Sequence, residues 1–85
     1  MATSKKPAPP KQKHWFQITV MGTAPIVARF RVFCETEDQA FQIWSQNPSM
    51  APIDGRPQIE LRQIIKKRIE IKNLITGMIK WIKTF

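Results

Sequence analysis

Apolar and polar residues alternate along two neighbouring stretches in the first half of the chain. Residues 14–21 (HWFQITVM) place an apolar side chain at every second position from Phe16, and residues 26–35 (IVARFRVFCE) do the same from Ile26. A period of two is typical of strands with one buried face. Residues 22–25 (GTAP) are turn formers. The pattern therefore predicts two strands joined as a hairpin.

A helix with a clear start is predicted over residues 36–48. Thr36 and Gln39 have the spacing of a capping box, and Glu37 and Asp38 fall in the first turn, where the helix dipole favours acids. Apolar residues then recur at a spacing of three to four until Pro48 ends the helix. Residues 47–57 contain three prolines and a glycine, which predicts a loop.

Residues 59–71 (IELRQIIKKRIEI) have mostly apolar side chains at odd positions and mostly charged ones at even positions. The alternation and the isoleucine content favour a strand, with a kink or turn near Lys66 and Lys67. A helix starting at Leu61 is the alternative, but it would bring Arg68 into the apolar stripe.

The last thirteen residues, NLITGMIKWIKTF, change to a helical spacing. Apolar side chains fall on one side of a helical wheel and lysines on the other, so an amphipathic helix is predicted over residues 73–85. Gly77 in its interior weakens that helix.

These elements predict an α+β fold with a small antiparallel sheet in the order β-β-α-β and one packed helix. Residues 1–13 (MATSKKPAPPKQK) form a disordered basic arm in this prediction, because they contain four lysines, three prolines and no hydrophobic periodicity. The expected organisation is an arm over 1–13, a folded domain over 14–72 and an amphipathic C-terminal helix over 73–85.

Charge narrows the classes of partner. The 85 residues have a formal net charge of +8, and two basic blocks, 1–13 and 56–85, flank a mildly acidic middle. Such a charge favours nucleic acid, an anionic membrane or an acidic protein surface. The single cysteine excludes an intrachain disulfide and suggests a reducing, cytoplasmic location. No apolar run has the length of a membrane span.

Catalytic and cofactor chemistry is not expected. His14 has no acid or nucleophile near it in sequence, and Cys34 falls on the apolar side of its strand. One histidine and one cysteine on separate segments do not form a metal site. No glycine-rich phosphate-binding motif occurs, so no cofactor is expected and the protein is interpreted as a non-enzyme.

A basic face is predicted on the side of the sheet away from the helix. Arginines, lysines and exposed aromatics such as Trp15 and Phe33 share strand parity there, which resembles a surface for stacking single-stranded nucleic acid. A solvated basic face with no ligand would have the same pattern. The candidate phosphate-contacting residues are Lys5, Lys6, Lys11, Lys13, Arg29, Arg31, Arg62, Lys66, Lys67 and Arg68.

The apolar stripe near the C-terminus is the second candidate surface. It comprises Leu74, Ile75, Met78, Ile79, Trp81, Ile82 and Phe85. The predicted helix could cover the bare sheet face or a second copy of the chain, dock on another protein, or lie on an anionic membrane. If it covered the sheet, it would bury the basic face, so the two candidate surfaces compete.

The function expected from these observations is non-enzymatic binding of nucleic acid (RNA or single-stranded DNA) or a ribonucleoprotein by charge. The alternative is a protein–protein interaction module, of the kind that viral or mobile-element accessory factors represent, which uses the C-terminal helix. A homo-oligomer is possible in either case, and peripheral membrane contact through the helix is a third option.

Overall fold

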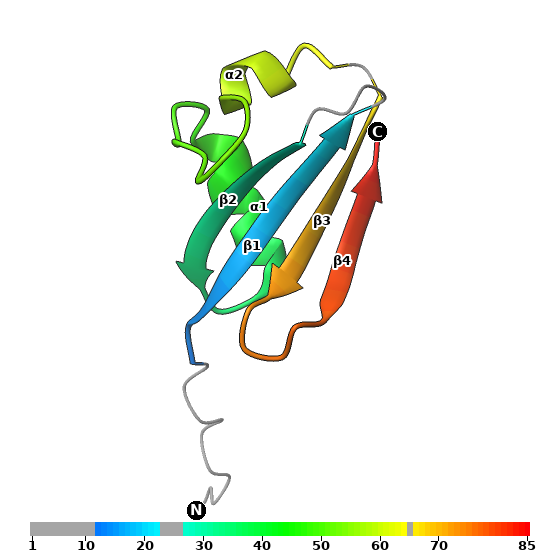
Figure 1. The fold of residues 1–85 in the computed structure, drawn as a ribbon. Coiled ribbons are helices and arrows are strands. Elements are labelled where there is room, and N and C mark those ends of the chain that lie inside the picture. The colour runs from blue at the N-terminus through cyan, green and yellow to red at the C-terminus, as the bar shows by residue number, and fades with distance from the viewer. Residues whose placement is uncertain (1–11, 23–26, 65) are drawn as a thin grey trace, which may run out of the picture.

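The structure is a computed structural model that describes residues 12–22, 27–64 and 66–85. Four strands and two helices follow one another as β1 (His14–Gly22), β2 (Val27–Cys34), α1 (Glu37–Gln46), α2 (Gln58–Leu61), β3 (Lys67–Asn73) and β4 (Ile79–Thr84). The strands form one antiparallel sheet in the order β2-β1-β3-β4 (Figure 1). The α+β class is confirmed, but the sheet has a fourth strand where a helix was predicted.

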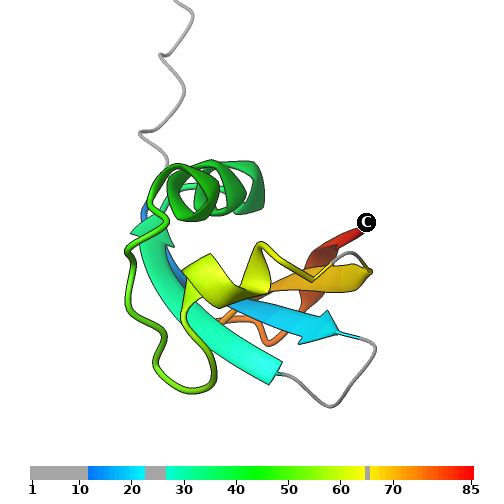
Figure 2. The ribbon, with the colours of Figure 1, turned by 90° about the horizontal axis from the view of Figure 1, so that it is seen from above.

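The core lies between the sheet and α1. In β1 and β2 every second side chain is buried, as the alternation predicts, and Ile69 and Ile71 of β3 continue the same face. Helix α1 contacts all four strands and contributes Ala40 and Trp44 to the core. Figure 2 shows α1 on one side of the sheet. The buried apolar residues are Phe16, Ile18, Val20, Ala28, Phe30, Val32, Cys34, Ala40, Trp44, Leu61, Ile69 and Ile71.

The start of α1 has the cap that the sequence predicts. The Thr36 hydroxyl accepts a hydrogen bond from the Gln39 amide (3.2 Å), while the Gln39 side chain accepts one from the Glu35 amide (2.9 Å). These bonds satisfy backbone donors that a helix start leaves without partners. The helix ends at Gln46, just before Pro48, and the loop predicted over 47–57 contains no strand or helix.

The strand predicted over residues 59–71, with a kink or turn near Lys66 and Lys67, is wrong in its first half. Residues Gln58–Leu61 form the short helix α2 instead, and the strand begins only at Lys67. Burial explains the difference. Gln58 and Leu61 are buried at helical spacing, and the Gln58 side-chain amide donates to the Trp44 carbonyl oxygen at the end of α1 (2.9 Å). Packing against α1 therefore outweighs the weak strand-like alternation of these residues and favours a helix.

The amphipathic helix predicted over residues 73–85 is also wrong: the segment forms a turn and the edge strand β4. The Asn73 side chain accepts from the amides of Ile75 and Thr76, and Gly77 has φ of +74°. A left-handed residue closes a hairpin turn but interrupts a helix, and glycine adopts it without strain.

A bulge in β4 explains why this strand imitates a helix in sequence. Ile71 pairs with Trp81 and Lys72 with Ile79, so Lys80 is an extra residue without a partner on β3. The extra residue breaks the alternation and places Ile79 and Ile82 three positions apart with both paired to polar residues of β3. A spacing of three is what a helix would also produce.

The face of the sheet opposite α1 is not covered by any element of the described residues (Figure 2). Neither helix in this part of the chain has the length and apolar character needed to cross a bilayer. The basic arm predicted over 1–13 and most of the turn predicted over 22–25 lie outside the described residues; only residues 12, 13 and 22 of these segments are included.

Candidate nucleic-acid interface

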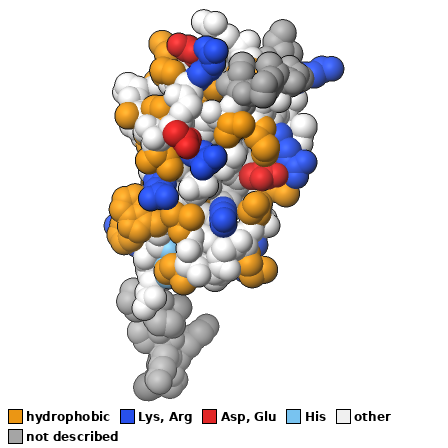
Figure 3. Space-filling model, in the orientation of Figure 1, with side chains coloured by type: hydrophobic (Ala, Val, Ile, Leu, Met, Phe, Trp, Pro, Cys, Tyr) orange, Lys and Arg blue, Asp and Glu red, His pale blue; other side chains and the backbone are white. Residues whose placement is uncertain are grey.

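The uncovered side of the sheet, here named the open face, faces the viewer in Figure 1 and carries interspersed basic and apolar side chains (Figure 3). The strand register arranges it in rows across the sheet. In order along the strands, the rows are Val27–Met21–Arg68–Thr84, Arg29–Thr19–Glu70–Ile82, Arg31–Gln17–Lys72–Ile79 and Phe33–Trp15.

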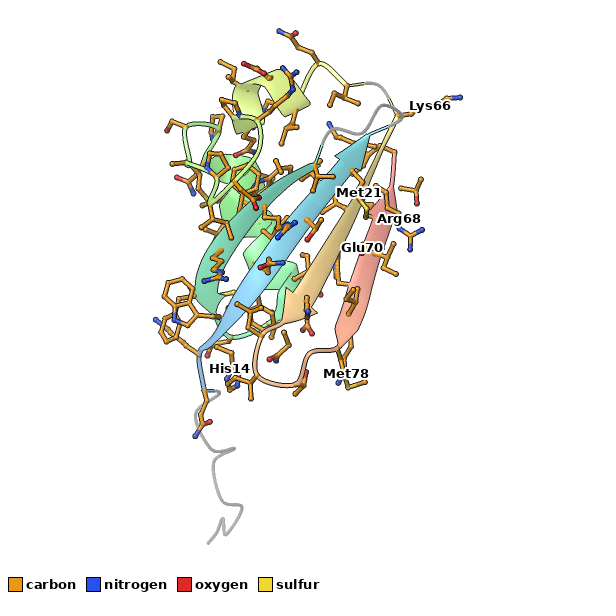
Figure 4. The ribbon with its side chains drawn as sticks, viewed as in Figure 1. His14, Met21, Lys66, Arg68, Glu70 and Met78 are labelled. Carbon is orange, nitrogen blue, oxygen red and sulfur yellow. The ribbon has the colours of Figure 1, made fainter. Side chains whose placement is uncertain are left out.

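Two of the four cations on the open face have acidic neighbours. The Arg29 guanidinium lies 3.5 Å from the Asp54 carboxylate, and the Arg68 Nε lies 2.9 Å from the Glu70 carboxylate. Figure 4 shows Arg68 and Glu70 close together. The Arg29–Asp54 pair is exposed on both sides, and such pairs contribute little stability. The Glu70 side chain is only 19% exposed, so its pair with Arg68 is the more sheltered of the two. Arg31 and Lys72 have no ion pair among the described residues.

The aromatic end of the open face consists of Trp15 and Phe33. The two residues are direct partners on β1 and β2. Their ring centroids are 5.1 Å apart at an angle of 50°, and the residues are 51% and 50% exposed. Tilted aromatic pairs at this distance stabilise each other. About half of the surface of each residue nevertheless remains exposed to water. Burying this apolar surface against a ligand would be favourable.

A shallow hollow of about 330 Å³ lies beside the aromatic end. Besides the two aromatic rings, its walls are formed by Lys13, His14, Arg31, Leu74 and Ile75. The Leu74 amide donates to the Trp15 carbonyl oxygen (3.1 Å), which holds the β3–β4 turn against β1. The hollow therefore combines an apolar floor with cations and has no carboxylate in its wall.

The basic residues predicted to contact phosphate are only partly brought together. Arg29, Arg31 and Arg68 share the open face, and Lys13 lies at its aromatic end. Lys5, Lys6 and Lys11 lie outside the described residues.

The remaining three predicted cations lie elsewhere. Arg62 donates to the Ser45 carbonyl oxygen at the end of α1 (2.8 Å). Lys66 precedes β3, at the end of the sheet far from His14, and its side chain points outward (Figure 4). The Lys67 ammonium contacts the Leu61 carbonyl oxygen and lies 5.1 Å from the centre of the Phe85 ring. Arg62 and Lys67 therefore do not belong to the open face, whereas Lys66 lies at its far end, where it lines a hollow with Met21 and Arg68.

The apolar residues predicted to form a partner-binding helix stripe are divided between two faces. Trp81 packs on the α1 side, where its ring stacks on Phe41 with centroids 4.7 Å apart and its indole N–H donates to Asp38 (2.8 Å). Leu74 and Ile75 line the hollow. Ile75, Met78, Ile79, Ile82 and Phe85 are all exposed. The stripe therefore exists as an exposed apolar edge rather than as one helix face.

His14 and Cys34 are closer than their sequence separation suggests, since they are direct partners on β1 and β2. The thiol donates to the Thr36 carbonyl oxygen (3.3 Å), and no hydrogen bond joins it to the imidazole. Burial raises the pKa of the Cys34 thiol above its ordinary value. A protonated thiol is a poor nucleophile. No cluster of three metal-ligating side chains occurs within residues 12–22, 27–64 and 66–85.

Sequence reasoning missed two charged residues of the open face, Lys72 and Glu70. The predicted strand stops at residue 71 and so leaves Lys72 out, whereas Lys72 is the last open-face cation of β3. Extending the alternation of Arg68 and Glu70 by two positions would have identified it.

Comparisons with protein-family models, with curated proteins and with solved structures gave no match.

Proposed function

We propose that this protein is a non-catalytic binding protein whose open face binds nucleic acid by charge. The observation that carries the proposal is the combination, on one uncovered sheet face, of four cations with an exposed aromatic pair. Arg31 and Lys72 have no acidic partner among the described residues, Arg29 has an exposed one, and Arg68 pairs with the half-buried Glu70. Cations and aromatic rings on a sheet are the groups that nucleic-acid-binding modules present to phosphates and bases.

The net charge of +8 supports the same proposal, because cations beyond the open face add to long-range attraction of a polyanion. Acidic side chains are not absent from the face, but Glu70 and Asp54 are outnumbered by the arginines and Lys72. A phosphate that approaches Arg29 replaces an exposed surface ion pair with a similar contact, so the cost of this exchange is small.

Salt dependence is the test. Release of counterions from four phosphates on a single strand gives a log–log slope of about −3, which is about a 50-fold loss of affinity between 50 and 200 mM salt. The measurement is fluorescence anisotropy of a labelled 20-nucleotide oligothymidylate, repeated with a 20-base-pair duplex. Absence of salt-dependent binding to both nucleic acids would show that the proposal is wrong.

A pair of charge-matched variants locates the binding site. The double variant Arg31→Gln/Lys72→Gln removes two open-face cations and is expected to reduce the slope by about 1.4. The control Arg56→Gln/Lys83→Gln removes two cations elsewhere: Arg56 pairs with Glu60, and the Lys83 ammonium lies 5.3 Å from the Phe41 ring centre on the α1 side. Equal effects of both double variants would show that net charge alone, and not the open face, binds the nucleic acid.

A second candidate function, a protein–protein interaction module, is supported by the exposed apolar edge at β4. Met78, Ile79 and Ile82 are each about half exposed on or next to an edge strand, and such strands are sites where another strand can pair. Sedimentation at several concentrations distinguishes self-pairing through this edge from a monomer. Self-pairing is wrong if the protein sediments as a monomer at every concentration and Ile82→Lys leaves its sedimentation unchanged. The membrane option lacks the amphipathic helix that it required.

A further inference from the structure

The hollow beside Trp15 and Phe33 differs from the rest of the open face in its electrostatics. Elsewhere on the face the arginines are accompanied by carboxylates, those of Asp54 and Glu70. The hollow is lined by Lys13, His14 and Arg31 and by no acid. An anionic group at this end therefore meets basic side chains that have no carboxylate among the residues lining the hollow.

The geometry of the aromatic pair leaves ring surface available to a ligand. The rings meet at 50° rather than lying parallel, and each residue is about half exposed. Leu74 and Ile75 also line the hollow, and Ile75 is 71% exposed. The apolar part of the lining thus combines aromatic rings with aliphatic groups. A flat, polarisable group fits such a space and gains stacking energy there.

We infer that the hollow binds one unpaired base of single-stranded nucleic acid, stacked on Trp15 or Phe33, with the adjoining phosphates at Arg31 and Lys72. This inference rests on the proposed function and names its ligand class. A volume of about 330 Å³ is at the small end of ligand pockets, which suits a single base with its sugar. A base in a duplex has both faces stacked on its neighbours, so only an unpaired base can enter.

Arg31 has a double part in this arrangement. It lies in the wall of the hollow and also begins the row Arg31–Gln17–Lys72 that crosses the sheet next to the aromatic pair. Strands in a sheet are about 4.8 Å apart, so Arg31 and Lys72, on either side of β1, are separated by about 10 Å at the backbone. The sugar-phosphate backbone of a strand whose base occupies the hollow can therefore pass between Arg31 and Lys72.

The test compares two oligonucleotides that have the same phosphates. One is a 12-nucleotide oligothymidylate, and the other is a 12-nucleotide abasic strand, which keeps the sugar-phosphate backbone and lacks every base. The wild type is expected to bind the oligothymidylate about 10- to 100-fold more tightly, since stacking of a base on an aromatic side chain contributes on that scale. Charge alone would give equal affinities.

Variants assign the preference to the aromatic pair. Trp15→Ala and Phe33→Ala are each expected to reduce the preference for the base-containing strand to within about threefold while leaving abasic binding unchanged, whereas Trp15→Phe retains most of it. Ile82→Ala, which removes a half-exposed apolar residue from the same face, is the control and is expected to keep the full preference. Circular dichroism verifies that each variant is folded.

The outcomes separate this inference from the proposed function. If the wild type binds both strands with equal affinity and with a salt-dependent slope, stacking is refuted and binding by charge stands. If Trp15→Ala and Ile82→Ala keep the preference equally, the hollow is not the base site and the inference is wrong. If neither of these strands and no duplex binds at 50 mM salt, the proposed function falls as well. Tighter binding of the duplex than of the oligothymidylate also overturns the inference.

Discussion

Replacing Trp81 tests whether the C-terminal segment forms a strand or a helix, because the two structures place Trp81 and Ile82 in different environments. In the strand, the Trp81 ring stacks on Phe41 (4.7 Å between centroids) and donates a hydrogen bond to Asp38, while Ile82 is 51% exposed. In the amphipathic helix that the sequence pattern favours, Ile82 lies in the middle of the apolar stripe and Trp81 lies at its edge. The losses in the free energy of unfolding caused by Trp81→Ala and by Ile82→Ala, compared with each other, therefore report which structure forms.

The magnitudes follow from these contacts. A fully buried tryptophan costs about 3–5 kcal/mol when truncated to alanine; because Trp81 is only partly buried, we expect about 2–3 kcal/mol for Trp81→Ala. Ile82→Ala removes a side chain that is already half in water, so about 1 kcal/mol or less is expected. For a domain of this size the first value lowers the melting temperature by roughly 10–20 °C.

The indole hydrogen bond is measured separately. Trp81→Phe keeps a ring on Phe41 and loses the donor to Asp38, and a double-mutant cycle with Asp38→Ala is expected to give a coupling of about 0.5–1 kcal/mol. The assay is urea unfolding followed by circular dichroism, with unchanged slopes required for the comparison. If Ile82→Ala destabilises the protein as much as Trp81→Ala, or if the cycle shows no coupling, the placement of β4 is refuted.

The remaining predictions concern three single positions. Gly77→Ala is expected to cost about 1–2 kcal/mol in thermal unfolding, because φ of +74° disfavours a Cβ although no atom lies within 4 Å of it, and Gly77→Asn is expected to cost less. Gly55→Ala should cost more than Gly77→Ala, since its Cβ would lie 2.1 Å from the Val27 carbonyl oxygen; equal costs would contradict this close packing. Cys34 should react with a thiol reagent at least about tenfold faster in urea than in the native state. Burial raises the pKa of this thiol, so its contribution to stability is present below about pH 8.5 and is lost at higher pH. The free energy of unfolding of the wild type, relative to that of Cys34→Ala, is therefore expected to decrease as the pH rises above about 8.5.

The parts of the fold that the sequence predicts correctly depend on short-range patterns. The alternation in β1 and β2 identifies their buried faces, and the capping residues Thr36 and Gln39 locate the start of α1. The parity of these strands also predicts that Trp15 and Phe33 share a face with Arg31. Each of these inferences needs only a period or a cap within a dozen residues.

The errors occur where a distant contact determines the local conformation. Helix α2 is four residues long and depends on the contact of Gln58 with Trp44. Strand β4 depends on β3 as its partner and contains the extra residue Lys80, so its alternation is broken. The ion pair between Arg29 and Asp54 requires the loop before α2 to pair with β2. None of these contacts leaves a periodic signal in the sequence.

Mapping of an oligothymidylate onto the backbone amides by ¹H–¹⁵N NMR tests the central claim most directly. The claim is that the open face, and above all its aromatic end, binds single-stranded nucleic acid. The largest shift changes are expected at the amides of Trp15, Gln17, Arg31 and Phe33 and at Lys72, with the amides of α1 unaffected. Changes that are confined to β4 or to α1, with none at the aromatic end, would contradict the account.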